Sequence, residues 1–581
     1  MVAPISPRVL LLRPPQVFPR WAHVSTICPP LGLAYVAASV QEAGFGVECL
    51  DAVGEAPFQQ IVLENPNFIS FGLSVPQILE RVQGSNCDVL GVSLMFSHDW
   101  PVTKAIIQAI RRVRPNLCIV AGGEHITALP QFCLEDCPEL DICVMGEGEA
   151  TLVDLLAALR DGRDLATVKG IAYRAASSIA RTPTRARIRK LEEIPWPAWD
   201  LFPLETYLAN GLGYGVNPGR SVPLLASRGC PFECTFCSNP DMWTTRWAAR
   251  PVADVIEEMA YYIEHYGAHN FDFYDLTTIV RKDWIIEFCQ ELVRRAWKIT
   301  WQMPAGTRSE ALDAEVLTWL TKSGQRNIVY APESGSAHTL KMIKKKIHLD
   351  RMKDSIRAAV AERMNIKLNM IMGFPHETRR EVFESYRFLA EVAWLGVDDV
   401  YIACFSPYPG SELFEQLRAA GEIPALDTDY FLKLTSISDL TSSRSYAPRL
   451  PDRMLTVYRL FGMALFYAIS YLTHPLRPFR TLLNVLRGRE ESRLEMSLLD
   501  MRDRLLPGKR VDTAAPAVVP ASRPAPPRRA LTKPDWLRPA VATVLLGTLS
   551  GAALDGTSDD DTKQRSRTST SVAAPDVEHD A

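Results

Sequence analysis

The stretch Ser227-Arg228-Gly229-Cys230-Pro231-Phe232-Glu233-Cys234-Thr235-Phe236-Cys237 decides the fold. It continues an apolar run, Leu224–Ser227, of the kind that forms a buried strand. Three cysteines fall within eight residues with the spacing C-x3-C-x2-C, whereas the other nine of the 12 cysteines are scattered along the chain. Three thiolates on one loop can ligate three corners of a cubane iron–sulfur cluster and leave one iron open for chemistry.

Zinc is the alternative metal for these thiolates. A structural zinc site normally needs a fourth protein ligand, and no His or Cys follows closely in the chain. We therefore predict a [4Fe–4S] cluster with Cys230, Cys234 and Cys237 as its metal ligands.

Strand and helix patterns alternate on the C-terminal side of this loop. Six strand–helix units in sequence favour a partial or complete α/β barrel whose active site lies on the loops after the strands. The predicted strands are Leu224–Ser227, Asn270–Tyr274, Ile299–Gln302, Asn327–Tyr330, Lys367–Met372 and Val400–Phe405. The predicted helices include Val252–Tyr266, Trp284–Trp297, Leu349–Glu362 and Arg379–Trp394.

The cysteine spacing directly after a barrel strand resembles the radical S-adenosylmethionine (SAM) superfamily. The resemblance implies a (βα)6 partial TIM barrel in which the open iron chelates the amino and carboxylate groups of SAM. An electron from the cluster, supplied by an external donor such as flavodoxin or ferredoxin, then cleaves SAM. The products are methionine and a 5′-deoxyadenosyl radical that abstracts hydrogen from the substrate.

The same resemblance assigns SAM-binding roles to residues on successive loops of the barrel. Phe236 matches the position beside the adenine, Arg308 would serve the carboxylate, and Glu333 with Ser334 would contact the amino acid or ribose. The remaining candidates are Ile371 and Gly373 after the fifth strand and Tyr408 after the sixth. No residue is assigned a catalytic role.

Each of these matches has a structural alternative. Glu333 could be a solvated loop carboxylate, and Gly373-Phe374-Pro375 is more often a turn than a cofactor contact. Two departures from the family pattern are Pro332, before the Glu, and Leu276-Thr277-Thr278, which replaces an acidic, Asn-containing run.

The N-terminal segment also alternates strands and helices. Val9–Leu12, Val47–Leu50, Val89–Leu94, Cys118–Ala121 and Ile142–Val144 read as strands of a doubly wound, Rossmann- or flavodoxin-like parallel sheet. Such a domain before a radical SAM barrel resembles the cobalamin-dependent branch of the superfamily. The candidate cobalamin-binding residues are Pro30, Leu31, Gly122, Gly123, His125, Gly146 and Gly148. A flavodoxin-like fold whose glycines only shape turns is the alternative.

A histidine ligand to cobalt is not expected. The D-x-H-x-x-G segment of methionine-synthase-like proteins is absent from the sequence, and His98 and His125 lack its context. We expect base-off cobalamin without a histidine ligand, which makes the cobalt easier to reduce and remethylate.

The predicted domains are cobalamin-binding over 1–165, a linker with a hairpin over 166–215, and radical SAM over 216–425. The hairpin is expected to pair Gly170–Arg174 near Arg185–Arg189. A helical region over 426–508 contains the uncharged run Leu460–Thr473, read as a helix capping the barrel or an interfacial anchor. The segment 509–581, rich in Ala, Pro, Ser, Arg and Asp, has the composition of a disordered tail.

Composition limits the partners and the location. With 64 Lys plus Arg against 67 Asp plus Glu, the charge gives no case for nucleic-acid binding. The N-terminus has too short an apolar core for a secretory signal, so we expect a cytoplasmic protein with at most peripheral membrane contact.

Together these features predict an enzyme with three cofactors, namely the [4Fe–4S] cluster, SAM and cobalamin. The resemblance implies methyl transfer from methylcobalamin to a non-nucleophilic carbon of a small, specialised-metabolite substrate by a radical mechanism. The alternative is oxidation or ring formation without methyl transfer, as in anaerobic porphyrin-ester cyclases. A methylthiotransferase fits less well, because the N-terminal half lacks a second ligand trio. A cobalamin sensor with a vestigial barrel would not need the intact cysteines.

Overall fold

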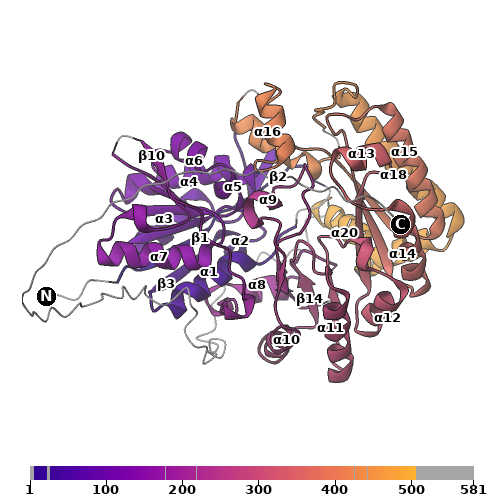
Figure 1. The fold of residues 1–581 in the computed structure, drawn as a ribbon, viewed down its shortest axis with the longest axis horizontal. Coiled ribbons are helices and arrows are strands. Elements are labelled where there is room, and N and C mark those ends of the chain that lie inside the picture. The colour runs from indigo at the N-terminus through magenta and orange to yellow at the C-terminus, as the bar shows by residue number, and fades with distance from the viewer. Residues whose placement is uncertain are drawn as a thin grey trace, which may run out of the picture. The chain divides into compact units, whose positions relative to one another are not determined.

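The computed structural model describes residues 6–22, 26–176, 178–216, 219–423, 425–440 and 443–505. Its N-terminal part is built on a seven-stranded sheet with the order β10-β9-β8-β7-β6-β1-β3. The five strands from β8 to β3 are parallel, and β9 and β10 continue the sheet antiparallel at one edge (Figure 1). Their bounds are β1 Val9–Arg13, β3 Val47–Asp51, β6 Val89–Ser93, β7 Cys118–Gly122, β8 Ile142–Val144, β9 Ile171–Arg174 and β10 Ile179–Arg181.

Helices cover both faces of this sheet, as the alternation of side chains along β1 shows. Val9 and Leu11 pack in a core with α1 (Leu31–Glu42) and α7 (Gly148–Asp161). Leu10 and Leu12 face a second core with α3 (Val75–Gly84) and α4 (Trp100–Val113). A parallel sheet buried on both faces is the doubly wound arrangement that the sequence predicts.

Two local predictions in this part are wrong. The hairpin partner of β9 is Ile179–Arg181, not Arg185–Arg189, because a short turn closed by Ala175 N–H to Ser178 C=O (2.8 Å) brings the chain straight back. The structure also has a strand where none is predicted between Val9–Leu12 and Val47–Leu50, namely β2 (Gln16–Pro19). This strand joins β5 (Phe68–Phe71) and β4 (Gln60–Val62) in a small antiparallel sheet that neighbouring sequence does not reveal.

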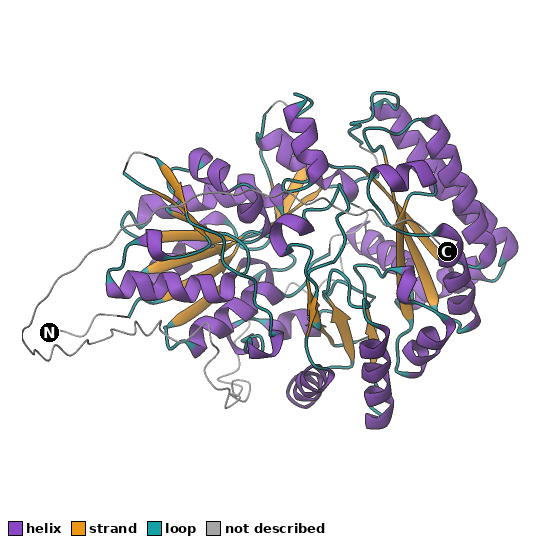
Figure 2. Cartoon of the chain, viewed as in Figure 1, coloured by secondary structure: helices purple, strands orange, loops and turns teal. Residues whose placement is uncertain are grey.

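The second part carries six parallel strands in chain order, arranged as two three-stranded sheets. The first sheet is β11-β14-β15 and the second is β16-β17-β18 (Figure 2). Parallel bridges Trp301–Gln325 and Thr307–Tyr330 link their adjoining edges. The strands are β11 Ser221–Leu224, β14 Asn270–Phe273, β15 Thr300–Gln302, β16 Asn327–Glu333, β17 Asn365–Met372 and β18 Asp399–Cys404. The partial barrel is confirmed, but its first strand begins three residues before the predicted Leu224.

Helices separate these strands at the predicted places. α10 spans Val252–Tyr266 as predicted, because Pro251 precedes its first turn and Gly267, at φ +61°, ends it in the left-handed conformation. The other helices of this part are α11 Lys282–Arg295, α12 Ala314–Lys322, α13 Ala337–Met342, α14 Leu349–Ala361, α15 Arg379–Leu395 and α16 Glu412–Ala419.

Short elements and four C-terminal helices complete the described chain. The helices α17 Thr428–Lys433, α18 Asp452–Thr473, α19 Arg477–Arg487 and α20 Arg493–Leu505 follow the last strand. α18 packs on α15 and β18 and covers the second sheet. The minor elements are α2 Ala52–Glu55, α5 Glu124–Ala128, α6 Pro130–Asp136, α8 Leu204–Ala209, α9 Asn239–Trp243, β12 Ser227–Arg228 and β13 Ala248–Ala249. The predicted tail, 509–581, lies outside the described residues.

Candidate functional site

The cysteine loop begins directly after β12 and is held close to β13. Gly229 lies at φ +83°, and a Cβ there would stand 2.2 Å from the carbonyl oxygen of Arg246, so only glycine fits. Asn239 donates from Nδ2 to the Cys230 carbonyl (3.2 Å), and the Cys237 N–H donates to the Cys234 carbonyl (3.0 Å). These contacts give the loop one defined course.

The three thiols of the loop interact with one another electrostatically. Each of Cys234 and Cys237 interacts electrostatically with Cys230, but in the described part of the chain no three His, Cys, Asp or Glu side chains converge as ligands of one ion. A structural zinc site normally takes four protein ligands, whereas a cubane can be held by three thiolates, each on a different iron. The donor set therefore fits a [4Fe–4S] cluster.

Two cations stand beside this loop. Burial raises the pKa of the Cys234 thiol, but Lys345 and Arg308 act in the opposite direction and favour the thiolate that a metal needs. Burial also raises the pKa of Cys237 to about 12. The guanidinium of Arg308 lies 3.4 Å from the centre of the Phe232 ring, on the same loop.

Glu333 is tied to this group through Lys345. Its Oε1 lies 2.9 Å from Nζ of Lys345, and both side chains are about nine-tenths buried, so Glu333 is not a solvated loop carboxylate. It stands at φ +66° at an irregularity in β16, a place where a proline such as Pro332 is tolerated within a sheet. Burial lowers the pKa of Lys345, but Glu333 and Cys234 raise it more, so the ammonium stays charged.

A cluster of mainly aromatic side chains packs beside the cysteine loop. Phe236, Ile371 and Gly373 belong to this part of the structure. The Phe236 ring lies 5.7 Å from that of Phe374, and Ile371 packs in the same core. Gly373, at φ +88°, donates its N–H to Glu377 Oε2 over 2.6 Å, and the Phe374 N–H does so over 3.2 Å. Burial raises the pKa of Glu377 to about 7 in spite of these two donors. The structure thus brings the predicted SAM-binding segment after the fifth strand against the cysteine loop.

Ser334 and Tyr408 stand apart from this cluster. The Ser334 hydroxyl is fully buried and accepts the Ser336 N–H (3.1 Å), which fixes the turn after β16. Tyr408 donates its hydroxyl to the Leu434 carbonyl (3.1 Å) and interacts electrostatically with Asp99 and Glu124 of the N-terminal part. Tyr408 therefore lies on the side of the barrel that faces the other domain.

The glycines predicted to bind cobalamin lie at the carboxyl edge of the N-terminal sheet. Gly122 ends β7, and Gly123, at φ +119°, would place a Cβ 2.2 Å from the Leu94 carbonyl oxygen, so the loops after β6 and β7 touch. Gly146 follows β8 at φ +74° and donates to Thr127 Oγ1 (2.9 Å). Gly148 begins α7 beside Val36 of α1.

Pro30 and Leu31 lie at the start of α1, where Pro30 is the N-cap and Leu31 is buried. The segment that follows β1 and contains β2 leads into these residues. The structure therefore brings them to the same edge of the sheet as the glycines.

The two histidines at this edge are uncharged at neutral pH. Burial lowers the pKa of His125 to about 3 and that of His98 to about 4. His125 contacts Ser97 Oγ through Nδ1 (2.9 Å) and Cys133 Sγ through Nε2 (3.5 Å), so both ring nitrogens have protein partners. In this orientation His125 is a core histidine and offers no nitrogen to cobalt.

A buried ion triad joins this edge to the cysteine loop. Arg228 donates from Nη1 to Glu147 Oε1 (3.1 Å) and from Nη2 to Glu149 Oε1 (2.6 Å), and all three side chains are about 95% buried. Burial lowers the pKa of Arg228, but Glu149 and Glu147 raise it above its ordinary value. We call these residues the Arg228 triad.

Further contacts join the same two edges. The Ser238 hydroxyl, just after Cys237, donates to Glu124, and Gly410, after β18, lies against Ala128. A cavity of about 330 Å³ also opens here, lined by Thr127, Gly146 and Glu147, by the segment after β10, and by Asp241 and Met242 of α9. The loops that follow the strands of both parts therefore share one region.

Family comparisons agree with this division. The B12 binding domain family matches residues 20–156, and the Radical SAM superfamily matches residues 224–389. The chain belongs to the cobalamin-dependent radical SAM superfamily. Its cofactors are accordingly a [4Fe–4S] cluster, SAM and cobalamin.

Relatives within this superfamily cover most of the chain. The chain is 29% identical over 408 residues to an uncharacterized methyltransferase of Pyrococcus horikoshii, PH0819, covering 70% of this chain and 82% of that protein. It is 25% identical over 461 residues to an anaerobic magnesium-protoporphyrin IX monomethyl ester cyclase of Rubrivivax gelatinosus (78% and 77% covered). The solved structure of the methyltransferase TsrM from Kitasatospora setae with cobalamin and a [4Fe–4S] cluster has the same fold, with a TM-score of 0.59 at 17% identity (80% and 89% covered).

Several residues of this site are not predicted from the sequence. Lys345 is one of three consecutive lysines, and nothing in the sequence singles it out. Glu147 and Glu149 lie in the run Gly146–Glu149, where only the glycines drew notice, and Arg228 lies about 80 residues away. One sequence feature could have indicated Arg228, Glu147 and Glu149. These charged residues lie inside runs rich in glycine or cysteine, and a charged side chain that becomes buried there needs a partner of opposite charge.

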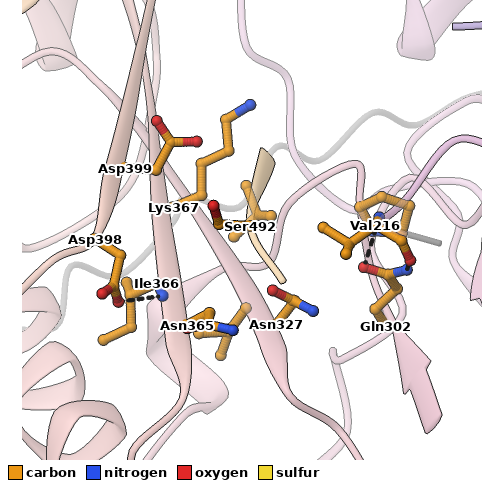
Figure 3. A pocket seen from close by; sticks show the side chains of 12 residues that line it. Val216, Gln302, Asn327, Asn365, Ile366, Lys367, Asp398, Asp399 and Ser492 are labelled. Carbon is orange, nitrogen blue, oxygen red and sulfur yellow. Dashed lines mark hydrogen bonds between the residues drawn. The ribbon is translucent and has the colours of Figure 1, made fainter. Parts of the chain in front are cut away.

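A second pocket lies at the opposite end of the barrel and is not part of this site. Asn327, Asn365 and Asp399 begin β16, β17 and β18 and line it (Figure 3). Val216 and Gln302 close one side with reciprocal hydrogen bonds of 3.2 and 2.5 Å. Active sites of such barrels lie at the carboxyl ends of the strands, so this end serves stability.

Proposed function

We propose that this chain is a radical SAM C-methyltransferase that places a methyl group carried by cobalamin on a non-nucleophilic carbon of a small, specialised-metabolite substrate. The observation that carries the proposal is the contact between the post-strand loops of the two domains. Arg228 stands two residues before Cys230 and binds carboxylates that flank Gly148. One substrate in this region would be within reach of both domains, as stepwise hydrogen abstraction and methyl transfer require.

When bound, the cluster with SAM supplies a hydrogen-abstracting radical and cobalamin supplies the methyl group. The protein's own residues bind, orient and neutralise these groups. We assign Cys230, Cys234 and Cys237 to the cluster, with Lys345 and Arg308 favouring the thiolates. Glu333 and Phe236 are assigned to SAM.

Polar atoms suited to a ligand lie beside these groups. Within the described chain, the buried hydroxyls of Thr277 and Thr278, after β14, have no hydrogen-bond partner. Buried hydroxyls are rarely left unpaired, so this position suits a polar group of SAM or substrate. The unusual Leu276-Thr277-Thr278 run thus becomes a candidate specificity segment.

The reaction also needs an electron from outside the chain, for which a flavodoxin or ferredoxin is the expected donor. We propose a cytoplasmic location, with any membrane contact peripheral. No contact with nucleic acid is proposed, because the charge is balanced.

The test uses SAM with a deuterated methyl group and reconstituted holoenzyme under anaerobic conditions. The product should gain the label, and S-adenosylhomocysteine and 5′-deoxyadenosine should form in comparable amounts. Omitting cobalamin should remove labelled product and leave some uncoupled SAM cleavage. Labelled product without deoxyadenosine would mean polar methyl transfer and would contradict the radical role of the barrel.

The cyclase-like alternative is supported by the similarity to the Rubrivivax cyclase. It predicts deoxyadenosine together with an oxidised product that carries no label. The same experiment separates the two functions, because only one of them adds a methyl group.

A further inference from the structure

Helix α19 exposes its apolar side to solvent and turns a polar side towards the protein. Phe479, Leu482, Leu483 and Leu486 recur at the spacing of one helical face, and their exposed fractions are 70%, 59%, 44% and 73%. The side turned inward is polar instead, where buried Asn484 donates to Glu495 Oε1 of α20 (2.9 Å). We call the four exposed side chains the α19 face.

The surrounding surface extends this face. Leu472, at the end of α18, and Leu476, before α19, are 82% and 80% exposed. Trp394, near the end of α15, is 70% exposed, and His474 lies against Gly396 just beyond it. Helices α15 and α18 lie side by side (Figure 1). Phe383 and Phe461 both contact the ring of Tyr386. Apolar exposure on this scale marks a binding surface.

Helix α19 itself carries only basic charge. Residues 477–489 contain four arginines, Arg477, Arg480, Arg487 and Arg489, and no acidic residue. Arg477 and Arg480 lie 3.0 and 3.6 Å from Asp398 Oδ1, and the Arg480 side chain is 48% exposed. Arg487 and Arg489 are exposed. Arg480 and Arg487 are seven residues apart, two helical turns, so they lie along one edge of the apolar stripe.

Helix α18 anchors this surface without crossing a bilayer. Among the described helices it alone is long and apolar enough to span a membrane, with 28% of its most apolar window buried. Its inner side carries fully buried Arg459, and Tyr467 donates to Asp399 Oδ1 of β18 (2.6 Å). These contacts fix α18 to the barrel, and α19 is left at the surface.

We propose that the α19 face is a peripheral binding surface for a bilayer containing anionic phospholipids. A basic helix with an exposed apolar stripe lies in the membrane interface, where apolar side chains enter the acyl boundary and arginines meet lipid phosphates. The segment 509–538 adds seven basic residues against Asp512 and Asp535, namely Lys509, Arg510, Arg523, Arg528, Arg529, Lys533 and Arg538. This segment has the same sign as α19, so charge favours a lipid surface over this segment as the partner.

The inference concerns a surface remote from the cysteine loop and does not depend on the proposed methyl transfer. Full-length protein is sedimented with vesicles of phosphatidylcholine alone and of phosphatidylcholine with phosphatidylglycerol. We expect binding to the anionic vesicles that weakens as salt rises. Arg480→Ala/Arg487→Ala should weaken binding about thirtyfold, since each basic residue near the surface contributes about 1 kcal/mol.

Leu482→Glu/Leu486→Glu should abolish binding. The matched control, Val62→Glu/Val293→Glu, changes two exposed apolar side chains elsewhere and should bind as wild type does. Equal binding to neutral vesicles, or loss of binding in the control, would overturn the proposal. So would binding that appears only after removal of the residues beyond Leu505, or a wild-type dimer that Leu482→Glu/Leu486→Glu converts to monomer.

Discussion

The Arg228 triad and the α19 face place side chains in opposite ways. At the triad, three charged groups are buried between the cysteine loop and the N-terminal sheet. On α19, four apolar groups face outward beside exposed arginines. Buried charge is costly unless it is paired, and an exposed apolar stripe adds little to folding. The contrast indicates that the triad holds the protein's own parts together, while the α19 face serves a partner outside the fold.

The largest effect is expected at the loop that the triad supports. Cys234→Ala should lower iron binding well below the about four irons per chain of a reconstituted [4Fe–4S] protein and abolish SAM cleavage, because one thiolate is lost. Iron analysis and deoxyadenosine formation measure this. Cys289→Ala, a buried cysteine of α11, should keep both properties. Cleavage retained by Cys234→Ala would refute the cluster assignment.

Breaking the triad itself should cost stability. Arg228→Met leaves buried Glu149 without its cation and leaves Glu147 with Arg187 alone, whose Nε lies 3.7 Å from Glu147 Oε2. The free energy of unfolding should therefore fall by about 3–5 kcal/mol in urea titrations. The control Arg163→Met removes a half-exposed partner of Asp154 and should cost at most about 1 kcal/mol.

A compensating variant sharpens this test. The double change Arg228→Met/Glu149→Gln should recover part of the loss, because Glu149, which within the described chain forms an ion pair only with Arg228, is no longer charged while Glu147 keeps Arg187. If it is no more stable than Arg228→Met alone, buried charge is not the cause.

The next effect is a pH dependence at Glu377. Burial raises the pKa of this carboxyl from 4.5 to about 7, so the fold favours the protonated form. The protonated carboxyl stabilises the folded state fully at pH values below its ordinary pKa. As pH rises towards 7 this contribution is lost, and the free energy of unfolding falls by at most about 1.4 kcal/mol per pH unit. Glu377→Gln still accepts the Gly373 and Phe374 N–H groups and should make the pH slope of the urea midpoints of the cofactor-free protein shallower.

Asp99 and Asp275, whose pKa values burial raises to about 7 and about 6, keep their contributions to that slope. Glu415→Gln, exposed on α16, should retain the full slope, and an unchanged slope in Glu377→Gln would contradict the assignment.

The smallest effect is expected on the α19 face. Leu486→Gln should change the free energy of unfolding by less than about 0.5 kcal/mol, because its side chain is already in water. Leu455→Ala, fully buried on α18, should cost about 2–5 kcal/mol. Comparable losses in the two variants would show that the α19 face packs within the protein.

Local patterns explain which parts of the fold the sequence predicts. Val252–Tyr266 is bounded by Pro251 and Gly267, and its apolar spacing is helical, so both ends are readable. The first barrel strand was misplaced because Ser221–Ser227 is apolar throughout most of its length and offers no period to fix the register. β2 was missed because its partner, β5, lies about 50 residues away.

In the candidate site, too, residues with local signals can be predicted and residues that depend on distant partners cannot. The cysteines and glycines are readable because their chemistry or backbone conformation is local, as at Gly229 and Gly123. Lys345 and the triad depend on pairs that the fold brings together from distant segments, and no spacing in one sequence reveals them. The assignments of individual residues to SAM and cobalamin remain predictions.

The triad also bears on the order in which the enzyme is assembled. Glu147 and Glu149 belong to the N-terminal domain, which leaves the ribosome before the radical SAM domain. Domains generally fold in the order of their synthesis. The N-terminal domain thus displays two carboxylates before Arg228 exists, and the emerging guanidinium has a fixed docking point. Since Arg228 is followed at once by Gly229 and Cys230, docking sets the path of the thiols before iron arrives. Iron would then be inserted into a loop whose course the first domain has already determined.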